Sequence, residues 1–344
     1  MLWTWVAFVI LILLLLALDL SVLNRRPHTI KMREALGWSA LWIALGVAFS
    51  GFIYWAYSAH WANLGLTPDA VDGRPNDGAS AAFKYLTGYL LEKALSIDNL
   101  FVMAVIFRFL AVPPEFQHRV LFWGIVGALA LRGLMIGVGT ELIVHYHWVL
   151  YLFGGFLIVT AVRMLFLPER PPDPARDPVF RLARRVLPFT SAYHGHHFLS
   201  IENGRRMLTP LALCLLLIET SDVVFAVDSI PAVFTVTADP FLVFTSNIFA
   251  VLGLRSLYFA LAGMVEKFHY LKVSLALVLA VVGLKMIGAH WIKQLGGEYG
   301  SLYLLIVVGA FLVVGIGASL LFPRRETETI PRALPGPVPL NPER

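Results

Sequence analysis

Two short segments place carboxylates at matching positions inside long apolar stretches. The segment EKALSIDNLF (92–101) recurs in altered form as DVVFAVDSIP (222–231), and each carries two acids six residues apart. The acids are Glu92 and Asp98 in the first segment, and Asp222 and Asp228 in the second. An ionised side chain at the centre of a bilayer costs roughly 2.5–3.5 kcal/mol on insertion scales, so such residues usually mark an ion or proton path. The two segments therefore predict cation binding, with protons as natural competitors.

Further oxygen donors lie beside these acids, and together they define a candidate metal site. The candidate metal ligands are Glu92, Asp98, Asn99, Glu219, Asp222 and Asp228, with Thr220, Ser229, Asn247, Arg132 and Arg255 in supporting positions. Carboxylate, hydroxyl and amide oxygens suit hard divalent ions such as Mn²⁺, Mg²⁺ or Ca²⁺, whereas copper and zinc sites usually recruit thiolate or imidazole. The sequence thus favours a hard divalent cation and is compatible with Mn²⁺.

Helix geometry limits how these side chains can meet. In an ideal helix Glu92 and Asn99 share a face, while Asp98 lies about 120° away. An ion that contacts both carboxylates must therefore sit between helices, or the helix must unwind locally. Pro231 favours local unwinding around Asp228, because proline lacks the N–H of a helical turn and disrupts the turn before it.

Simpler interpretations remain open for several of these residues. The acids could pair with buried basic residues and only hold a helix bundle together; the basic candidates are Lys93, Arg132, Arg255 and Lys285. Arg132 and Arg255 are more simply counter-charges than ligands, and Asn247 could line a path or cap a helix. The histidines of YHGHHF, His194, His196 and His197, could capture metal or sense pH, but a histidine cluster in a loop is weak support for either.

Composition assigns the class of protein. The chain has 344 residues, of which 58% are hydrophobic and 14% charged, with a mean hydropathy of +0.75. These values predict an all-α protein with many membrane spans, in contact with the lipid bilayer. The net charge of +5 comes from basic residues in short stretches between apolar runs, so it predicts membrane orientation rather than nucleic-acid binding. The single cysteine, Cys214, has no disulfide partner in the chain.

Nine apolar runs are long enough to cross a membrane. They cover residues 2–23, 36–57, 81–111, 120–144, 148–167, 208–234, 241–263, 272–291 and 300–322. Basic residues gather in alternate loops, above all in 168–207, which predicts an external N-terminus and a cytoplasmic C-terminus. The acidic loop 58–79 is then external, and its carboxylates could attract cations, although a solvated loop is the simpler expectation.

An inverted repeat of three plus three helices accounts for the matching segments. Arg132-Gly133-Leu134 corresponds to Arg255-Ser256-Leu257, and LIVTAVRM (157–164) corresponds to LAVVGLKM (279–286), in the same order along the chain. We therefore divide a transmembrane domain (1–323) into repeat one (81–167), a cytoplasmic loop (168–207) and repeat two (208–291), followed by a disordered proline-rich tail (324–344). Inverted repeats are typical of secondary transporters, whose substrate site lies between the repeats near the midplane.

Three segments resemble the TerC family of integral membrane proteins: EKALSIDNLFV from Glu92, TPLALCLLLIETSDVVFAVDSIPAVF from Thr209 and DPFLVFTSNIFAVLGLRSLYFAL from Asp239. The resemblance covers most of residues 15–322. It implies Mn²⁺ efflux and metal homeostasis in the bacterial cytoplasmic (inner) membrane, with Glu92, Asp98, Glu219, Asp222 and Asp228 at the family's acidic positions. Other members are linked to tellurium resistance, to alkaline-pH response or to assisting exported proteins.

We therefore expect a secondary transporter that exports Mn²⁺ as its substrate, in exchange for protons, and that needs no resident cofactor. The alternative is a membrane partner that assists insertion or metalation of exported proteins without transport. An enzyme is not expected. No GxGD sequence, the signature of one class of membrane aspartyl proteases, surrounds Asp98, Asp222 or Asp228.

Overall fold

The computed structural model describes residues 2–23, 32–167, 177–190, 193, 195, 197–202, 204–261, 269–288 and 300–322. His194, His196 and the proline-rich tail lie outside these residues. The helices before the loop region are α1 (Leu2–Leu23), α2 (Met32–Ser58), the short 3₁₀ helix η1 (Trp61–Asn63), α3 (Gly78–Phe109), α4 (Pro114–His145) and α5 (Trp148–Phe166). They are followed by α6 (Pro178–Val186), β1 (Leu199–Glu202), β2 (Arg205–Leu208), α7 (Pro210–Phe234), α8 (Pro240–Val251), α9 (Leu254–Leu261), α10 (His269–Ile287) and α12 (Gly300–Leu321).

The predicted all-α membrane architecture is confirmed. Among the described residues, seven helices are long and apolar enough to cross a membrane: α2, α4, α5, α7, the α8–α9 segment, α10 and α12. The described apolar part of α1, 3–18, is shorter, and α3 is more highly charged. Helix α3 is nevertheless 32 residues long, about 48 Å, and packs against α2, α7, α8 and α12. Protein rather than lipid therefore surrounds most of its charges.

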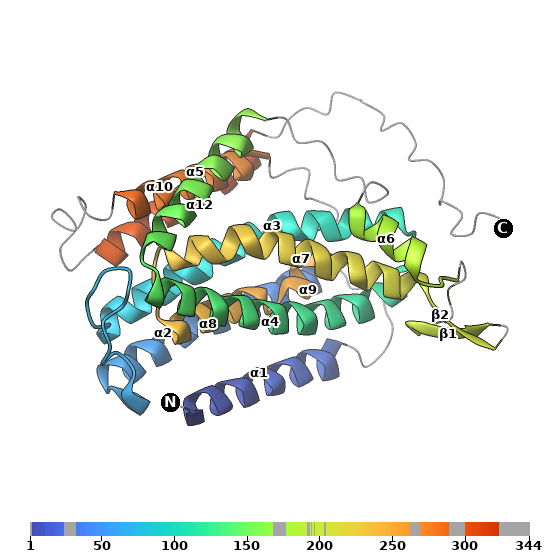
Figure 1. The fold of residues 1–344 in the computed structure, drawn as a ribbon, viewed down its shortest axis with the longest axis horizontal. Coiled ribbons are helices and arrows are strands. Elements are labelled where there is room, and N and C mark those ends of the chain that lie inside the picture. Colours follow the sequence, from blue (N-terminus) through green and yellow to red (C-terminus); the bar gives the residue numbers. More distant parts are fainter. Residues whose placement is uncertain are drawn as a thin grey trace.

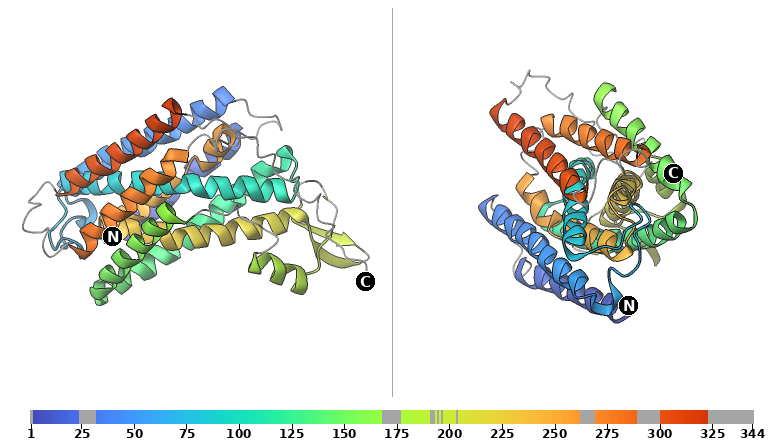
Figure 2. Two further views of the ribbon diagram at one scale, coloured as in Figure 1. Left: turned by 90° about the horizontal axis from the view of Figure 1, so that it is seen from above. Right: turned by 90° about the vertical axis from the view of Figure 1, so that its left-hand side faces the viewer.

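Helices α3 and α7 lie in the middle of the bundle and run in opposite directions (Figure 1; end-on view in Figure 2, right). Helix α3 packs on α8, α7 packs on α4, and α5 packs on α10. If α3, α4 and α5 are matched in order with α7, α8/α9 and α10, the α3–α8 pair corresponds to the α7–α4 pair, and the α5–α10 pair corresponds to itself. The packing is therefore consistent with the predicted inverted repeat.

The two ends of the bundle carry different loops. Helix α6 and the antiparallel hairpin lie at one end, and the α2–α3 loop lies at the other (Figure 1). In the hairpin, Leu199 pairs with Leu208 and Glu202 with Arg205. Its basic sequence belongs to the end predicted to be cytoplasmic, and we use "external end" for the end with the α2–α3 loop.

Helices α6 and α8 each begin with an aspartate N-cap that is followed by proline at the first helical position, a combination that favours helix initiation. Asp177 accepts hydrogen bonds from the first turn of α6, and Asp239 accepts them from Phe241 and Leu242 of α8. Asp77 likewise accepts a bond from Ser80 at the start of α3. The carboxylate of Asp239 also contacts other elements, as described below.

Two expectations about helix breaks are wrong. Helix α7 continues through Asp228 to Phe234 with Pro231 inside it, so it does not unwind at the site. The run expected to be continuous from 241 to 263 is instead broken between α8 and α9 at Gly253, whose φ is +82°. At this break the Lys93 ammonium donates to the carbonyls of Ala250 (3.1 Å) and Leu252 (3.4 Å), which replaces bonds that a continuous helix would supply.

The break predicts a sharp effect of Gly253→Ala. A Cβ atom at Gly253 would lie 2.6 Å from Cβ of Trp42, and its positive φ is costly for any L side chain. We expect the substitution to lower stability by about 1–3 kcal/mol, measured by thermal unfolding of the purified protein in detergent. Gly137→Ala is the matched control, because nothing lies within 4 Å of a Cβ at that position. Equal stability of both variants would contradict the strain at the break.

The outer faces of the bundle are apolar. Leu14 of α1 is 63% exposed, Val159 of α5 66% and Val313 of α12 71%. Large aliphatic side chains that are exposed to this extent would be unfavourable in water but suit the hydrocarbon of a bilayer.

Candidate functional site

The two acidic segments meet at the middle of their helices. Glu92 has 14 residues before it and 17 after it in α3, and Asp222 has 12 on each side in α7. Because α3 and α7 pack against each other in opposite directions, both residues fall near the centre of the bundle. In a spanning helix this position corresponds to the membrane midplane, where the repeat predicts the site.

A buried ion cluster joins the two segments through Arg132 of α4. Its Nε and Nη2 atoms donate to the two carboxylate oxygens of Asp222, at 3.0 and 2.8 Å, while Nη1 donates to Glu92 Oε1. Asn99 Nδ2 donates to Asp222 Oδ1 at 2.6 Å, and Arg132 Nη1 also contacts Asn247 Oδ1 of α8 at 3.3 Å. The guanidinium is 2% exposed, Glu92 1% and Asp222 3%. A fork of parallel N–H donors on a carboxylate is the strongest geometry that arginine offers.

A cavity of about 50 Å³, with room for a few water molecules or an ion, lies against this cluster. It is lined from α3 by Glu92, Leu95, Ser96, Asp98 and Asn99, from α4 by Arg132, from α5 by Thr160 and Met164, from α7 by Phe225, Asp228 and Ser229, and from α10 by Leu279. The wall therefore carries three carboxylates against one guanidinium. The cavity itself lies between helices, where the first geometric alternative would put an ion.

Four of the lining residues have oxygen atoms that are buried and lack a hydrogen-bond partner. They are Glu92 Oε2, Ser96 Oγ, Asn99 Oδ1 and Ser229 Oγ. Each residue is at most 2% exposed. A buried oxygen without a partner is destabilising by about 1–3 kcal/mol, so natural proteins rarely keep several at one place without a use for them. Oxygens that can coordinate a cation, beside carboxylates, provide such a use.

The structure does not bring every candidate residue to the cavity. Asp98, Asn99, Asp228, Ser229 and Arg132 line it with Glu92, while Asp222 lies directly behind Arg132. Glu219 instead approaches Gly127 of α4. Thr220 donates its hydroxyl to the Leu216 carbonyl of its own helix, Asn247 contacts Nη1 of Arg132 without lining the cavity, and Arg255 is buried in α9.

Six lining residues were not among the candidates: Leu95, Ser96, Thr160, Met164, Phe225 and Leu279. Thr160 and Met164 come from α5, which supplied no candidate. Both belong to the segment LIVTAVRM, and Leu279 of the cavity opens its counterpart LAVVGLKM. The hydroxyl of Thr160 within an apolar span was the one sequence signal that could have identified them.

The cavity does not form a closed metal cage. Within the described part of the chain, no group of three or more His, Cys, Asp or Glu side chains is close enough together to hold a metal ion. An ion bound here would take two carboxylates at most at once, with hydroxyl, amide and water oxygens completing its shell. Such a partly hydrated site suits an ion that must also leave.

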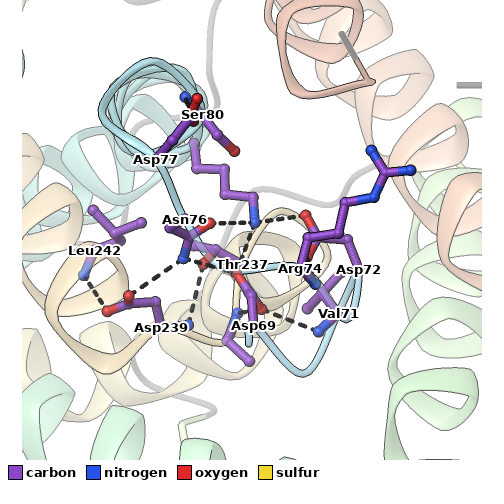
Figure 3. A network of polar contacts seen from close by, with 12 residues as sticks. Asp69, Val71, Asp72, Arg74, Asn76, Asp77, Ser80, Thr237, Asp239 and Leu242 are labelled. Carbon is purple, nitrogen blue, oxygen red and sulfur yellow. Dashed lines mark hydrogen bonds and ion pairs between the residues drawn. The ribbon is translucent and has the colours of Figure 1, made fainter. Parts of the chain in front are cut away.

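A second polar cluster closes the external end, and we call it the loop clasp. It consists of Asp69, Asp72 and Asn76 of the α2–α3 loop, Lys84 of α3, Thr237 and Asp239 of the α7–α8 connection, and Tyr57 of α2. The Lys84 ammonium lies 2.9 Å from Asp69, 2.7 Å from Asp72 and 2.6 Å from Asn76 (Figure 3). Asp69 accepts bonds from the Thr237 hydroxyl and from Ala238 N (2.9 Å). Through Asp69 the clasp thus joins Lys84 of α3 to Thr237 of the α7–α8 connection.

The clasp corrects the expectation of a solvated acidic loop. Asp69 is 4% exposed and Asn76 1%, and Asp239 accepts a 2.8 Å hydrogen bond from the Tyr57 hydroxyl. Burial alone would raise the pKa of Asp69, but the Lys84 charge and the bonds from Thr237 and Ala238 outweigh it and hold that pKa below its ordinary value. Burial raises the pKa of Asp239 above its ordinary value, although the Tyr57 hydrogen bond opposes the rise.

Comparisons with known proteins agree with these features. The chain is 48% identical over 290 residues to "Uncharacterized membrane protein STKORF319" of Myxococcus xanthus, covering 84% of this chain and 85% of that protein. It is 40% identical over 314 residues to "Putative membrane-bound redox modulator Alx" of Escherichia coli (strain K12), covering 90% and 94%. No solved structure matches the chain. The family model for the integral membrane protein TerC family matches residues 77–327, which include both acidic segments, the cavity lining and three clasp residues (Lys84, Thr237 and Asp239), and the chain therefore belongs to the TerC family.

Proposed function

We propose that this protein is a secondary transporter that exports a divalent cation, Mn²⁺ first among them, across the bacterial cytoplasmic membrane in exchange for protons. The observation that carries the proposal is the cavity between α3, α5, α7 and α10, where carboxylates and partnerless oxygens meet at the middle of two antiparallel helices. The donor set is chemically that of a hard cation, and the choice of Mn²⁺ within that set rests on the family resemblance.

The arrangement suggests how transport proceeds. Asp98 and Asp228 lie on opposite repeats and face one cavity, so a relative movement of the repeats would change which end of the bundle reaches them. In this structure the loop clasp joins the repeats at the external end. We infer that the clasp must loosen before an ion leaves on the external side.

A redox role is named for the Escherichia coli relative. In this chain Cys214 is the sole cysteine and is fully buried, so thiol–disulfide exchange within the chain cannot supply such a role. Metal export would affect redox balance indirectly. A role in tellurium resistance would also be indirect, because a negatively charged oxyanion suits an acid-lined cavity poorly.

Flux through the purified protein tests the proposal. We expect proteoliposomes that contain an Mn²⁺-sensitive dye to take up Mn²⁺ faster than protein-free vesicles, and an imposed pH gradient to change the rate. A simultaneous record with a pH-sensitive dye shows whether protons move in the opposite direction. Absence of Mn²⁺ flux under both conditions, in protein that elutes as a single folded species, would favour the alternative of a non-transporting membrane partner.

A further inference from the structure

Arg132 occupies the position that a transported cation would need in order to reach both central carboxylates. Its guanidinium uses both oxygens of Asp222 and one oxygen of Glu92. Resting on the proposed function, we propose that Arg132 is a tethered competitor: it pairs with Glu92 and Asp222 when no ion is bound, and it must withdraw when a divalent cation binds them.

Charge explains why a competitor is needed. Glu92 and Asp222 are almost completely buried and are held close together by the same guanidinium. Without a cation between them, two ionised carboxylates in a poorly hydrated place would repel each other and would lose their hydration. Arg132 compensates them from within the chain. A carrier that has released its ion can therefore change conformation without carrying an uncompensated charge.

The remaining contacts give the exchange a route. Glu92 Oε2 has no partner and Glu92 lines the cavity, so an incoming ion can contact this oxygen while Arg132 still holds Oε1. Asn99 donates to Asp222 and keeps its own Oδ1 without a partner. Asn247 Oδ1 of α8 already lies 3.3 Å from Nη1, the nitrogen that also donates to Glu92, and can accept the displaced guanidinium.

The charge arithmetic favours a divalent ion over a monovalent one. The single charge of Arg132 pairs with the two carboxylates of Glu92 and Asp222, which leaves a net charge of −1 when both are ionised. A monovalent ion brings no more charge than the arginine that it would displace. A divalent ion brings one charge more, which supplies the driving force for displacement.

Equilibrium binding separates this idea from a purely structural role. We expect Arg132→Gln to bind Mn²⁺ about tenfold more tightly than wild type, measured by calorimetric titration in detergent, because one competing cation held by several charge-assisted bonds is gone. We expect its Mn²⁺ flux in proteoliposomes to fall, because nothing displaces the ion at release. Arg132→Lys keeps the charge but loses the fork, so its affinity should lie between the two.

Lys285→Gln is the matched control. It also removes one positive charge inside the bundle, but the Lys285 ammonium contacts the Thr235 carbonyl rather than the cavity acids, so its Mn²⁺ affinity should equal that of wild type. An equal rise in both glutamine variants would indicate a general charge effect and overturn the proposal.

Each failure has a distinct signature. Wild-type flux together with an unchanged or weaker affinity in folded Arg132→Gln would overturn the tethered competitor and leave the proposed function standing. Absence of wild-type flux would instead overturn the proposed function. If Arg132→Gln does not fold, Arg132→Lys decides the matter, and an affinity equal to or below that of wild type in that variant would overturn the proposal.

Discussion

Replacing Asp98 or Asp228 by asparagine is expected to reduce Mn²⁺ flux about a hundredfold, because each change removes one full charge from a cavity where water screens charges only partly. The two residues come from opposite repeats and both line the cavity, so each single substitution should suffice. Asparagine keeps the size and a hydrogen-bonding oxygen of the side chain. The loss should therefore appear in flux and leave the elution profile and thermal unfolding of the purified protein close to wild type.

Glu141→Gln provides the control for this experiment. Glu141 is a carboxylate of α4 whose side chain is 74% exposed and pairs only with its neighbour His145 among the contacts in the structure. It loses the same charge far from the cavity lining, so its flux should match that of wild type. Wild-type flux in both aspartate variants would mean that the ion does not pass through this cavity.

The acidic residues that line the cavity could be singled out in the sequence because their charge conflicts with their apolar surroundings. Glu92, Asp98, Asp222 and Asp228 stand out in apolar runs, and their matching spacing predicted both the repeat and the meeting of α3 with α7. The angular argument predicted an ion position between helices as one of its two alternatives, and the cavity lies between helices. Local periodicity was sufficient for these conclusions.

Tertiary packing decided what the sequence left open. Pro231 alone suggested unwinding near Asp228, but α7 stays helical there and packs on α3 and α4 along its length. The real break, at Gly253, lies in a run whose apolar pattern is continuous. Trp42 of α2 packs so closely against Gly253 that there is no room for a side chain at the break, and no local pattern predicts this contact between residues distant in sequence.

The acidic loop shows the same limit. Local composition, with turn residues and several aspartates, predicts a solvated segment. Asp69 is instead buried because Lys84, Thr237 and the backbone of Ala238 lie around it, and two of these partners are more than 150 residues away. Composition reports that a loop is polar but does not report whether its polar groups find buried partners.

The depressed pKa of Asp69 gives the clasp a defined pH window. Its folded pKa lies below the ordinary value of 3.8, so the ionised form is preferred in the folded state. The stabilisation is therefore fully present above that ordinary value and is lost as the pH falls through the folded pKa. At neutral pH Asp69 is therefore ionised in the wild-type clasp, and removal of Lys84 takes away the charge that holds its pKa down.

Lys84→Met is expected to lower the free energy of unfolding by about 3–5 kcal/mol, the usual cost of removing one partner from a buried ion pair. Lys84 is 1% exposed, and its loss leaves the buried Asp69 carboxyl with neutral hydrogen-bond donors and no counter-charge. Thermal unfolding in detergent at neutral pH measures the effect.

The double variant Asp69→Asn/Lys84→Met removes both charges and should recover part of the stability lost in the single variant, because no uncompensated charge remains. A double variant that is less stable than Lys84→Met by the full cost of Asp69→Asn alone would show that the two residues act independently. The clasp would then contribute hydrogen bonds to Asp69 but no ion pair of consequence, and the external end would be joined by Thr237 and Ala238 rather than by Lys84.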